Sequence, residues 1–269
     1  MTSRVRLDVE GSLALVTLNR PEKHNGMDFE MLDAVVDVQR KIAQRRELRA
    51  VIVRGEGPSF CAGLDFKTVL GKPLATAARY TELFARRENT FQTWSMGFRR
   101  LGVPVIAAVH GNCFGAGMQL ALGADIRIAR ADAQFSLMEA KWGLVPDMGG
   151  PTLLRELVPI DVAKELTLTG RILSGEEAKR LNLVTHLAED PLAHARGLAE
   201  ELEQRSPDAV AAGKFLLQEA WGASEAEALS AERRWQRRIL GLKNQRISIE
   251  RNQKKAALPY ARRRIGDLS

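Results

Sequence analysis

The segment Val103–Gln119, VPVIAAVHGNCFGAGMQ, constrains the fold of this chain more than any other. Its first half is a short apolar run with β-branched residues, a pattern typical of a buried strand. Gly111 and the Gly115–Gly117 triplet follow, and a helical pattern begins after them. A strand that passes through small residues into a helix leaves backbone N–H groups free where the helix dipole adds positive charge. The segment therefore indicates either a tight strand-to-helix connection or a place that holds a negative oxygen.

A second segment of small residues, Ser59–Lys67, has the sequence SFCAGLDFK and follows a strand pattern and a Gly-Glu-Gly-Pro turn. Small residues again allow a ligand to approach the backbone closely. One such turn is weak evidence, but two in one chain suggest a pair of N–H donors. Donors at Leu64 and Ala116 would form a two-donor oxyanion hole.

The rest of the chain predicts an α/β core followed by helices. Val5–Glu10 and Leu13–Asn19 read as a hairpin, a helix with Asp28 as its N-cap follows, and one long amphipathic helix is expected over Arg79–Arg100. From Gly149 onward most of the pattern is helical. We expect residues 1–200 to form the core with the substrate site and residues 201–269 to form a helical region with a basic tail.

The charge of the chain is unevenly distributed. Between Glu232 and Arg264 there are 12 Lys or Arg and 2 Asp or Glu, whereas the other residues carry 28 against 31, within a net charge of +7. Such a tail could bind nucleic acid, a membrane surface or an anionic ligand. Alternatively, it is a helical face exposed to solvent, which is the usual role of such a charge run. We expect no membrane partner and no nucleic-acid partner.

Other sequence features indicate the cellular compartment of the protein and whether it binds a metal. The N-terminal residues lack the apolar stretch of a signal peptide, and no apolar run approaches the roughly 18 residues of a membrane span. We therefore expect a cytoplasmic protein in which Cys61 and Cys113 are buried thiols. The four histidines have no metal-ligand spacing, so we expect no metal.

These segments and several others together resemble the crotonase superfamily of enoyl-CoA hydratases and isomerases. The resemblance runs from about Leu13 to the basic tail. It is carried, in this order, by NRPEKHN (19–25), FCAGLD (60–65), HGNCFGAGMQ (110–119), ADIRIA (124–129) and WGLVPDMGG (142–150). The order is highly specific for the superfamily and much less specific for the reaction.

The resemblance implies a spiral of ββα units, with C-terminal helices that assemble a homotrimer or a hexamer. It implies an acyl-CoA thioester as substrate, so that coenzyme A is part of the substrate and no separate cofactor is expected. The thioester oxygen would accept from the N–H groups of Leu64 and Ala116. The residues that would contact the CoA moiety are Ala62 through its carbonyl, Arg20, Lys23 and Lys67 near the phosphates, and Tyr260 and Arg263 from the tail.

The resemblance also implies acid–base chemistry by carboxylates. Hydratases of the superfamily use two glutamates, and here the first position holds Gln119, whose amide neither takes nor gives a proton at working pH. Glu139 fills the second position. Asp147 stands where the isomerases that shift a diene carry a carboxylate. A Glu139–Asp147 pair is isomerase-like, although Gln119 departs from the diene isomerases as well.

The most consistent hypothesis is an enzyme that moves a double bond in an enoyl- or dienoyl-CoA, with catalytic candidates Glu139, Asp147 and Gln119. An enoyl-CoA hydratase is the alternative within this class. A CoA- or RNA-binding homologue without turnover is the alternative of another class. A serine hydrolase on a similar fold is disfavoured because no Ser adjoins Ala116. For the acyl pocket, the sequence suggests the lining residues Leu70, Phe84 and Trp94.

Overall fold

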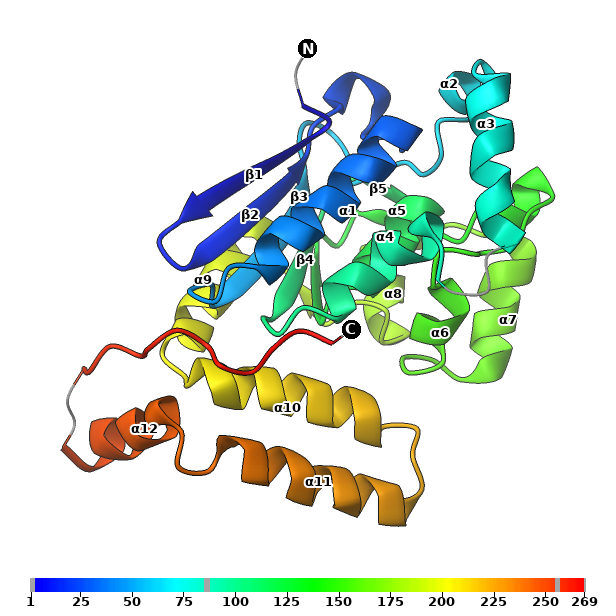
Figure 1. The fold of residues 1–269 in the computed structure, drawn as a ribbon. Coiled ribbons are helices and arrows are strands. Elements are labelled where there is room, and N and C mark those ends of the chain that lie inside the picture. Colours follow the sequence, from blue (N-terminus) through cyan, green and yellow to red (C-terminus); the bar gives the residue numbers. More distant parts are fainter. Residues whose placement is uncertain (1–2, 85–87, 255–256, 269) are drawn as a thin grey trace.

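A sheet with the strand order β1-β2-β3-β4-β6-β9 forms the framework of the molecule. Figure 1 shows its strands β1 to β4. The computed structural model describes residues 3–84, 88–254 and 257–268. The strands are β1 (Val5–Glu10), β2 (Leu13–Leu18), β3 (Ala50–Gly55), β4 (Val105–Val109), β6 (Ile126–Ala129) and β9 (His186–Leu187). The pair β1–β2 is the predicted antiparallel hairpin, and every other pairing in this sheet is parallel.

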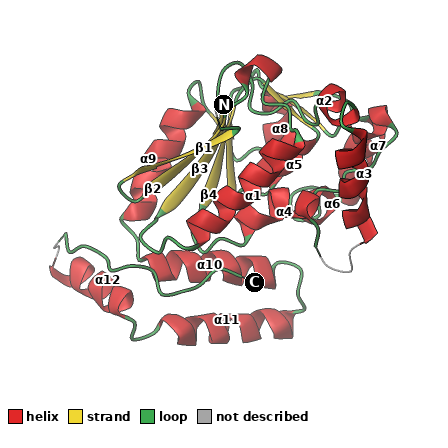
Figure 2. Cartoon of the chain, turned by 45° about the horizontal axis from the view of Figure 1, so that its top comes forward, coloured by secondary structure: helices red, strands yellow, loops and turns green. Residues whose placement is uncertain are grey.

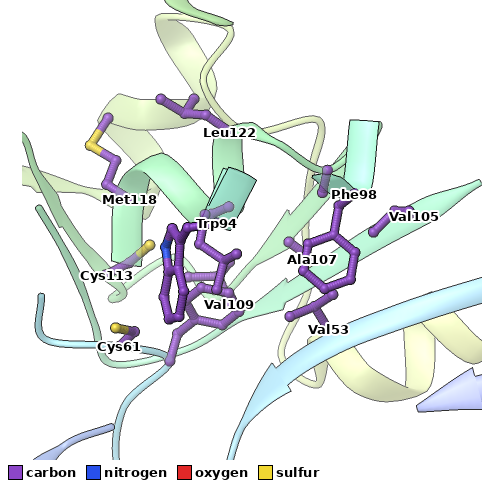
Figure 3. Packing of buried hydrophobic residues seen from close by; sticks show 14 of the residues in the cluster. Val53, Cys61, Trp94, Phe98, Val105, Ala107, Val109, Cys113, Met118 and Leu122 are labelled. Carbon is purple, nitrogen blue, oxygen red and sulfur yellow. The ribbon is translucent and has the colours of Figure 1, made fainter. Parts of the chain in front are cut away.

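The central strands β2, β3 and β4 are buried on both faces, as expected for parallel strands covered by helices. Alternate residues of the strands face opposite sides. Val53, Val105 and Ala107 belong to the main core, where Figure 3 shows them beside Trp94 and Phe98. Their neighbours along the strands, which include Ile52 and Ile106, pack instead in a second cluster with Ala195 of α9 (Pro191–Glu203).

Two helices cover the main-core face of the sheet. They are α1 (Phe29–Ala43), which begins at the predicted N-cap Asp28, and α4 (Thr90–Arg99). The helix α9 lies on the other side of the strands, as Figure 2 shows. The remaining helices of this part are α2 (Phe66–Leu70), α3 (Pro73–Tyr80), α5 (Ala116–Leu122), α6 (Gly150–Leu154), α7 (Ile160–Thr169) and α8 (Gly175–Arg180), with 3-10 turns at Pro21–Lys23, Thr81–Phe84 and Glu139–Trp142.

A smaller sheet lies beside the first one and carries the residues of the site. It contains β5 (Asn112–Phe114), β7 (Gln134–Ser136) and β8 (Leu173–Ser174) in the order β5-β7-β8. The sequence predicted β7 but treated residues 112–114 as part of a turn. In the structure this stretch is a strand parallel to β7, and Cys113 packs opposite Phe135.

The single long helix expected over Arg79–Arg100 is wrong. The structure ends α3 at Tyr80 and continues as a 3-10 turn to Phe84, and α4 begins at Thr90. The side chain of Asn89 accepts a hydrogen bond from the N–H of Gln92, and Gln92 bonds back to the Asn89 N–H. This capping box starts a new helix, so the charged pattern belongs to two helices and not one. Residues 85–87 of the expected helix lie outside the described part.

The C-terminal region is helical. It contains α10 (Pro207–Ala220), α11 (Glu225–Ile239) and α12 (Lys243–Lys254), of which α12 was not anticipated. Phe215 stacks near Trp235 between α10 and α11, with ring centroids 5.7 Å apart. Lys214 forms a buried ion pair with Asp125 of the core at 2.8 Å. The α/β class with a helix-rich C-terminal region is therefore confirmed. Across the described residues, no helix has the length and apolarity to cross a membrane.

Candidate active site

The two small-residue segments of the sequence meet through their cysteines. Cys61 and Cys113 form an isolated parallel bridge, and the Cys61 N–H donates to the Asn112 carbonyl at 2.9 Å. Both thiols are free and buried, as predicted, and Figure 3 shows them beside each other. Burial raises the pKa of Cys61 to about 12, so this thiol is inert at neutral pH. Because Leu64 and Ala116 each follow a bridged cysteine by three residues, this pairing brings them to the same edge.

The N–H of Leu64 faces away from its bridge partner. Met27 pairs with Leu64 in parallel fashion: the Met27 N–H donates to the Gly63 carbonyl at 2.7 Å, and the Asp65 N–H donates to the Met27 carbonyl at 2.9 Å. In such a bridge the N–H of the central residue points to the opposite side. Within the described part of the chain, the Leu64 N–H donates to no backbone carbonyl.

The N–H of Ala116 is the first of α5 and has no intrahelical acceptor. Its N-cap, Gly115, has φ 49° and ψ −116°, a conformation that residues with a Cβ rarely adopt. A Cβ built on Gly63 would lie 3.8 Å from the Ala116 nitrogen, which shows how closely the two segments approach. A Cβ built on Gly115 would lie 3.5 Å from Oε1 of Glu139. Two backbone donors and a carboxylate therefore converge on one place.

These groups open onto a cavity of about 390 Å³. Its walls are mostly apolar, and Phe66 and Trp142 stack across them with ring centroids 4.3 Å apart. Of the predicted site residues, the cavity is lined by Ala62, Leu64, Ala116, Glu139 and Asp147. This is the shape of a small-molecule site, a concave apolar pocket with a few convergent polar groups.

Glu139 lies at the start of the 3-10 turn that follows β7, and it is half-buried. Its Oε1 accepts a hydrogen bond from Gln119 at 2.6 Å, whereas its buried Oε2 has no hydrogen-bond partner among the residues that the structure describes. Burial raises the pKa of Glu139, and the nearby charge of Asp147 adds to the rise, against the hydrogen bond from Gln119. A carboxylate with a raised pKa and one unpaired oxygen suits a general base.

Asp147 lies in the loop between the 3-10 turn and α6, at the exposed rim of the same cavity. Its neighbours in this wall are the apolar side chains of Leu144 and Val145. Desolvation by these surroundings raises the pKa of Asp147 above the usual value for aspartate. The cavity therefore holds two carboxyl groups that favour the protonated form more than ordinary surface carboxyls do.

Gln119 does not line the cavity, although the sequence made it a catalytic candidate. It is completely buried in α5. Its Nε2 donates to Glu139, and its Oε1 accepts from the N–H groups of Met148 at 2.9 Å and Gly150 at 3.0 Å. With both ends of the amide engaged, Gln119 touches Glu139 and the loop of Asp147, and it has no free group to offer a substrate.

The lysines expected near the CoA phosphates are exposed. Lys23 ends the first 3-10 turn, and Lys67 lies in α2 directly behind the Leu64 segment. Among the described residues, no carboxylate lies within ion-pair distance of Lys67. Both side chains therefore have their charge available for a ligand.

Arg20 is a correction to the sequence-based expectation. Its side chain is only 5% exposed and forms ion pairs with Asp65 at 2.8 Å and Asp28 at 3.7 Å. It also donates to the Gly26 carbonyl at 2.9 Å. These contacts tie the turn before α1 to the turn before α2. Arg20 is thus a structural residue, because a phosphate contact would require a buried pair to break.

Of the two tail residues, Arg263 is a correction to the sequence-based expectation, whereas the contact of Tyr260 with the CoA moiety stays a prediction. Arg263 is buried and pairs with Asp267 at 3.3 Å. Tyr260 bonds to Ser248 at 3.1 Å and stacks with Arg251. Both pack against the C-terminal helices, and neither lines the cavity.

The suggested acyl-pocket residues are wrong. Leu70 and Phe84 point into solvent, and Trp94 is fully buried, with its indole N–H donating to the Ala116 carbonyl at 2.8 Å. The wall is formed instead by residues that the sequence reasoning passed over: Phe29, Phe66, Val69, Tyr80, Leu83 and Phe91. The apolar faces of α2 and α3 would have indicated some of them.

Comparisons with known proteins identify the family of this chain. A family model described as "Enoyl-CoA hydratase/isomerase" matches residues 8–260. Enoyl-CoA hydratase EchA19 of Mycobacterium tuberculosis is 33% identical over 82% of this chain and 83% of that protein. The mitochondrial Delta(3,5)-Delta(2,4)-dienoyl-CoA isomerase of Dictyostelium discoideum is 32% identical over 77% of this chain and 73% of that protein. The crystal structure of an enoyl-CoA hydratase from Polaromonas sp. JS666 superposes with a TM-score of 0.84 at 31% identity, covering 96% of this chain and 99% of that one.

The matched region includes every motif that carried the resemblance in the sequence. The relatives are named both for water addition and for double-bond movement, so the comparisons establish the family and the acyl-CoA class of enzyme. The chain belongs to the enoyl-CoA hydratase/isomerase family of the crotonase superfamily.

Proposed function

We propose that this enzyme moves a double bond along the acyl chain of an enoyl-CoA or dienoyl-CoA. The thioester oxygen accepts hydrogen bonds from the N–H groups of Leu64 and Ala116. These donors stabilise the negative charge that develops on this oxygen when a proton leaves the α carbon. Lys23 and Lys67 hold the CoA phosphates by charge-assisted contacts, and the Ala62 carbonyl faces the adenine.

Glu139 removes the proton. With a 3-enoyl-CoA, its Oε2 takes a proton from C2, and the electron pair is delocalised over the enolate and the C3–C4 double bond. Asp147, in its protonated form, then gives a proton to C4, and the double bond moves to C2–C3. The raised pKa of Asp147 favours the protonated form that this step needs. Because Asp147 lies at the exposed rim, it regains a proton from water.

One observation carries this proposal: the buried Oε2 of Glu139 has no partner in the described protein and belongs to a carboxylate whose other oxygen is fixed. A buried acceptor without a hydrogen-bond partner destabilises the folded state. Such groups are typical of functional sites, where the acceptor interacts with a substrate. The second carboxyl in the same cavity, that of Asp147, can supply the proton that C4 receives.

The hydratase alternative has weaker support from the geometry. Water addition needs one group to activate water and another to deliver a proton. Gln119 occupies the position of the first hydratase glutamate, and its amide is already bound to Glu139, Met148 and Gly150. A hydratase would therefore have to work with Glu139 and without help from Gln119.

The exchange of substrate protons with D2O tests the proposed roles. Glu139→Gln should abolish exchange at C2 of octanoyl-CoA, because Glu139 is the carboxylate that lies beside Gly115 and the Ala116 donor. Asp147→Asn should slow isomerisation of trans-3-octenoyl-CoA while C2 exchange continues. General acid–base groups contribute about 10²–10⁴-fold, so both losses are measurable by NMR. Exchange that persists at the wild-type rate in the Glu139→Gln variant would refute the assignment of the base.

A further inference from the structure

The amide of Gln119 connects three parts of the site from behind the cavity wall. It donates to Oε1 of Glu139 at 2.6 Å, and it accepts from the N–H groups of Met148 at 2.9 Å and Gly150 at 3.0 Å. Met148 follows Asp147 directly. One buried side chain therefore contacts both the carboxylate of one catalytic candidate and the backbone that carries the other.

The orientation of this amide is determined by its partners. Two backbone N–H groups can only donate, so the atom that faces them must be the oxygen. The nitrogen then faces Glu139, which accepts. The reversed amide would place an N–H₂ group against two N–H donors and an oxygen against a carboxylate oxygen. Gly150 makes the contact possible, because a Cβ there would lie only 2.7 Å from Oε1 of Gln119.

We propose that Gln119 is a positioning residue, which aims the carboxylate of Glu139 into the cavity and anchors the loop that carries Asp147. The inference rests on the proposed function for its catalytic meaning. By holding Oε1, Gln119 leaves Oε2 as the oxygen that has no hydrogen-bond partner among the described residues. The residue acts through Glu139 and Asp147, and it does not touch the substrate.

The neutrality of Gln119 is as important as its length. A glutamate at this position would still accept from Met148 and Gly150, but its second oxygen would face the Glu139 carboxylate. Two carboxylates in contact cannot both ionise at moderate cost, so they would share a proton. Asp147 is the other charged group that acts on Glu139. Arg79 lines the same cavity, but its charge is paired with Asp33 and Glu82.

An exchange of the two residues tests the contact without any assay of activity. Gln119→Glu should lower the Tm at pH 7, because it creates the carboxylate pair. The double variant Gln119→Glu/Glu139→Gln restores one amide and one carboxylate with their positions reversed. We expect it to recover more Tm than Glu139→Gln alone adds to the wild-type protein. A double variant no more stable than Gln119→Glu would overturn the proposal.

The pH dependence of C2 exchange tests the positioning role. Gln119→Met has a similar length but cannot donate to the ionised Glu139. Removal of a hydrogen bond to the charged form raises a pKa, so the acid limb of the pH profile should move upward by about one unit. The rate at the plateau should also fall, because a misplaced base costs up to about 10²-fold. An unchanged acid limb would overturn the proposal.

The chain offers a matched control in Asn244→Asp. The Asn244 amide, also buried, donates to the Asp208 carboxylate at 2.7 Å in the C-terminal helical region. This variant should lose stability as Gln119→Glu does, with the acid limb of the exchange profile unchanged. A shift of equal size in this control would show that the profile reports general destabilisation. If the wild-type enzyme exchanges no proton, the proposed function fails, and the Tm measurements alone then decide whether the contact exists.

Discussion

The carboxyl of Glu139 shows how one side chain can be made reactive at the expense of folding. Burial is the main cause of its raised pKa, and the ordinary value for glutamate is 4.5. The folded chain therefore binds this proton more tightly than the unfolded chain does. The ionised form costs folding free energy at every pH above the folded pKa, and the cost disappears as the pH falls below the unfolded value.

Glu139→Gln should accordingly raise the free energy of unfolding at pH 7. The gain should be about 1.4 kcal/mol for each unit by which the pKa is raised, less what solvent screening removes at this half-buried position. It should vanish in acid below pH 4.5, where the wild-type side chain is neutral in both states. Urea denaturation at both pH values measures the change. Glu189→Gln, at a residue whose side chain is 95% exposed, is the control and should show no gain. A Glu139→Gln variant less stable than wild type at pH 7 would contradict this reasoning.

Lys67 offers a second test at single-residue scale. Lys67→Ala should weaken binding of octanoyl-CoA far more than binding of octanoyl-pantetheine, which lacks the nucleotide phosphates. The difference should be roughly 1.5–3 kcal/mol, the range of a charged hydrogen bond. Calorimetry measures both affinities. Lys72→Ala is the control, since Lys72 is also exposed but pairs with Glu30 at 3.3 Å. Equal losses for both ligands would show that Lys67 does not touch the phosphates.

The sequence predicted some residues of the site and misjudged others for one physical reason. Glu139 and Asp147 were found because motifs fix their distance from the oxyanion segments along the chain. Whether Arg20 and Arg263 can bind a ligand depends on the carboxylates that lie beside them in the fold. Arg20 pairs with Asp65, and Arg263 pairs with Asp267. A basic side chain in a sequence looks the same whether its charge is free or neutralised by a buried carboxylate.

At the scale of elements, the short strand β5 is one of the parts that the sequence did not predict. Three residues are too few for a periodic signal, and Gly111 and Gly115 on either side suggest a turn. The strand exists because β7 and the Cys61 segment supply hydrogen-bond partners on its two sides. Pairing with the same strand brings Leu64 beside Ala116. Contacts between distant segments therefore determine both the presence of β5 and the position of the two N–H donors.

Gly115, between β5 and α5, allows a test of this junction. Gly115→Ala forces a side chain into φ 49° and ψ −116° beside Glu139, which should cost about 1–3 kcal/mol of stability. It should also slow C2 exchange by about 10²-fold, because the Ala116 donor moves. Gly11→Ala is the control, at φ 59° in an open hairpin turn, and should lose stability only. Thermal denaturation and exchange kinetics provide the readouts. Wild-type exchange in Gly115→Ala would argue against a donor at Ala116.

At the scale of the whole molecule, the C-terminal helices are bound to the core and still expose apolar surface. Arg46 donates to the Ile265 carbonyl at 2.8 Å, and Lys214 reaches Asp125. Phe215 is buried, but Leu217 and Trp221 on α10 are 58% and 68% exposed. Exposed large apolar residues of this kind are typical of surfaces that pack against another chain.

We therefore expect the protein to be a homotrimer or a hexamer in solution. Assembly through α10 would remove Leu217 and Trp221 from water. Light scattering coupled to size-exclusion chromatography measures the mass, to be compared with 29.8 kDa for one chain. The replacement Trp221→Glu should weaken the assembly, whereas Leu74→Glu, at an exposed position on α3, should not. A wild-type monomer at micromolar concentration would exclude this assembly.

The most direct test of the whole account follows the wild-type enzyme with two substrates in D2O by NMR. With trans-3-octenoyl-CoA, the account predicts that the double bond moves to C2–C3 and that one deuteron appears at C4. With trans-2-octenoyl-CoA, it predicts that water adds at least about 10-fold more slowly than the bond migrates, because only one of the two groups needed for hydration is present. Rapid hydration that survives Asp147→Asn would contradict the account and identify a hydratase that depends on Glu139.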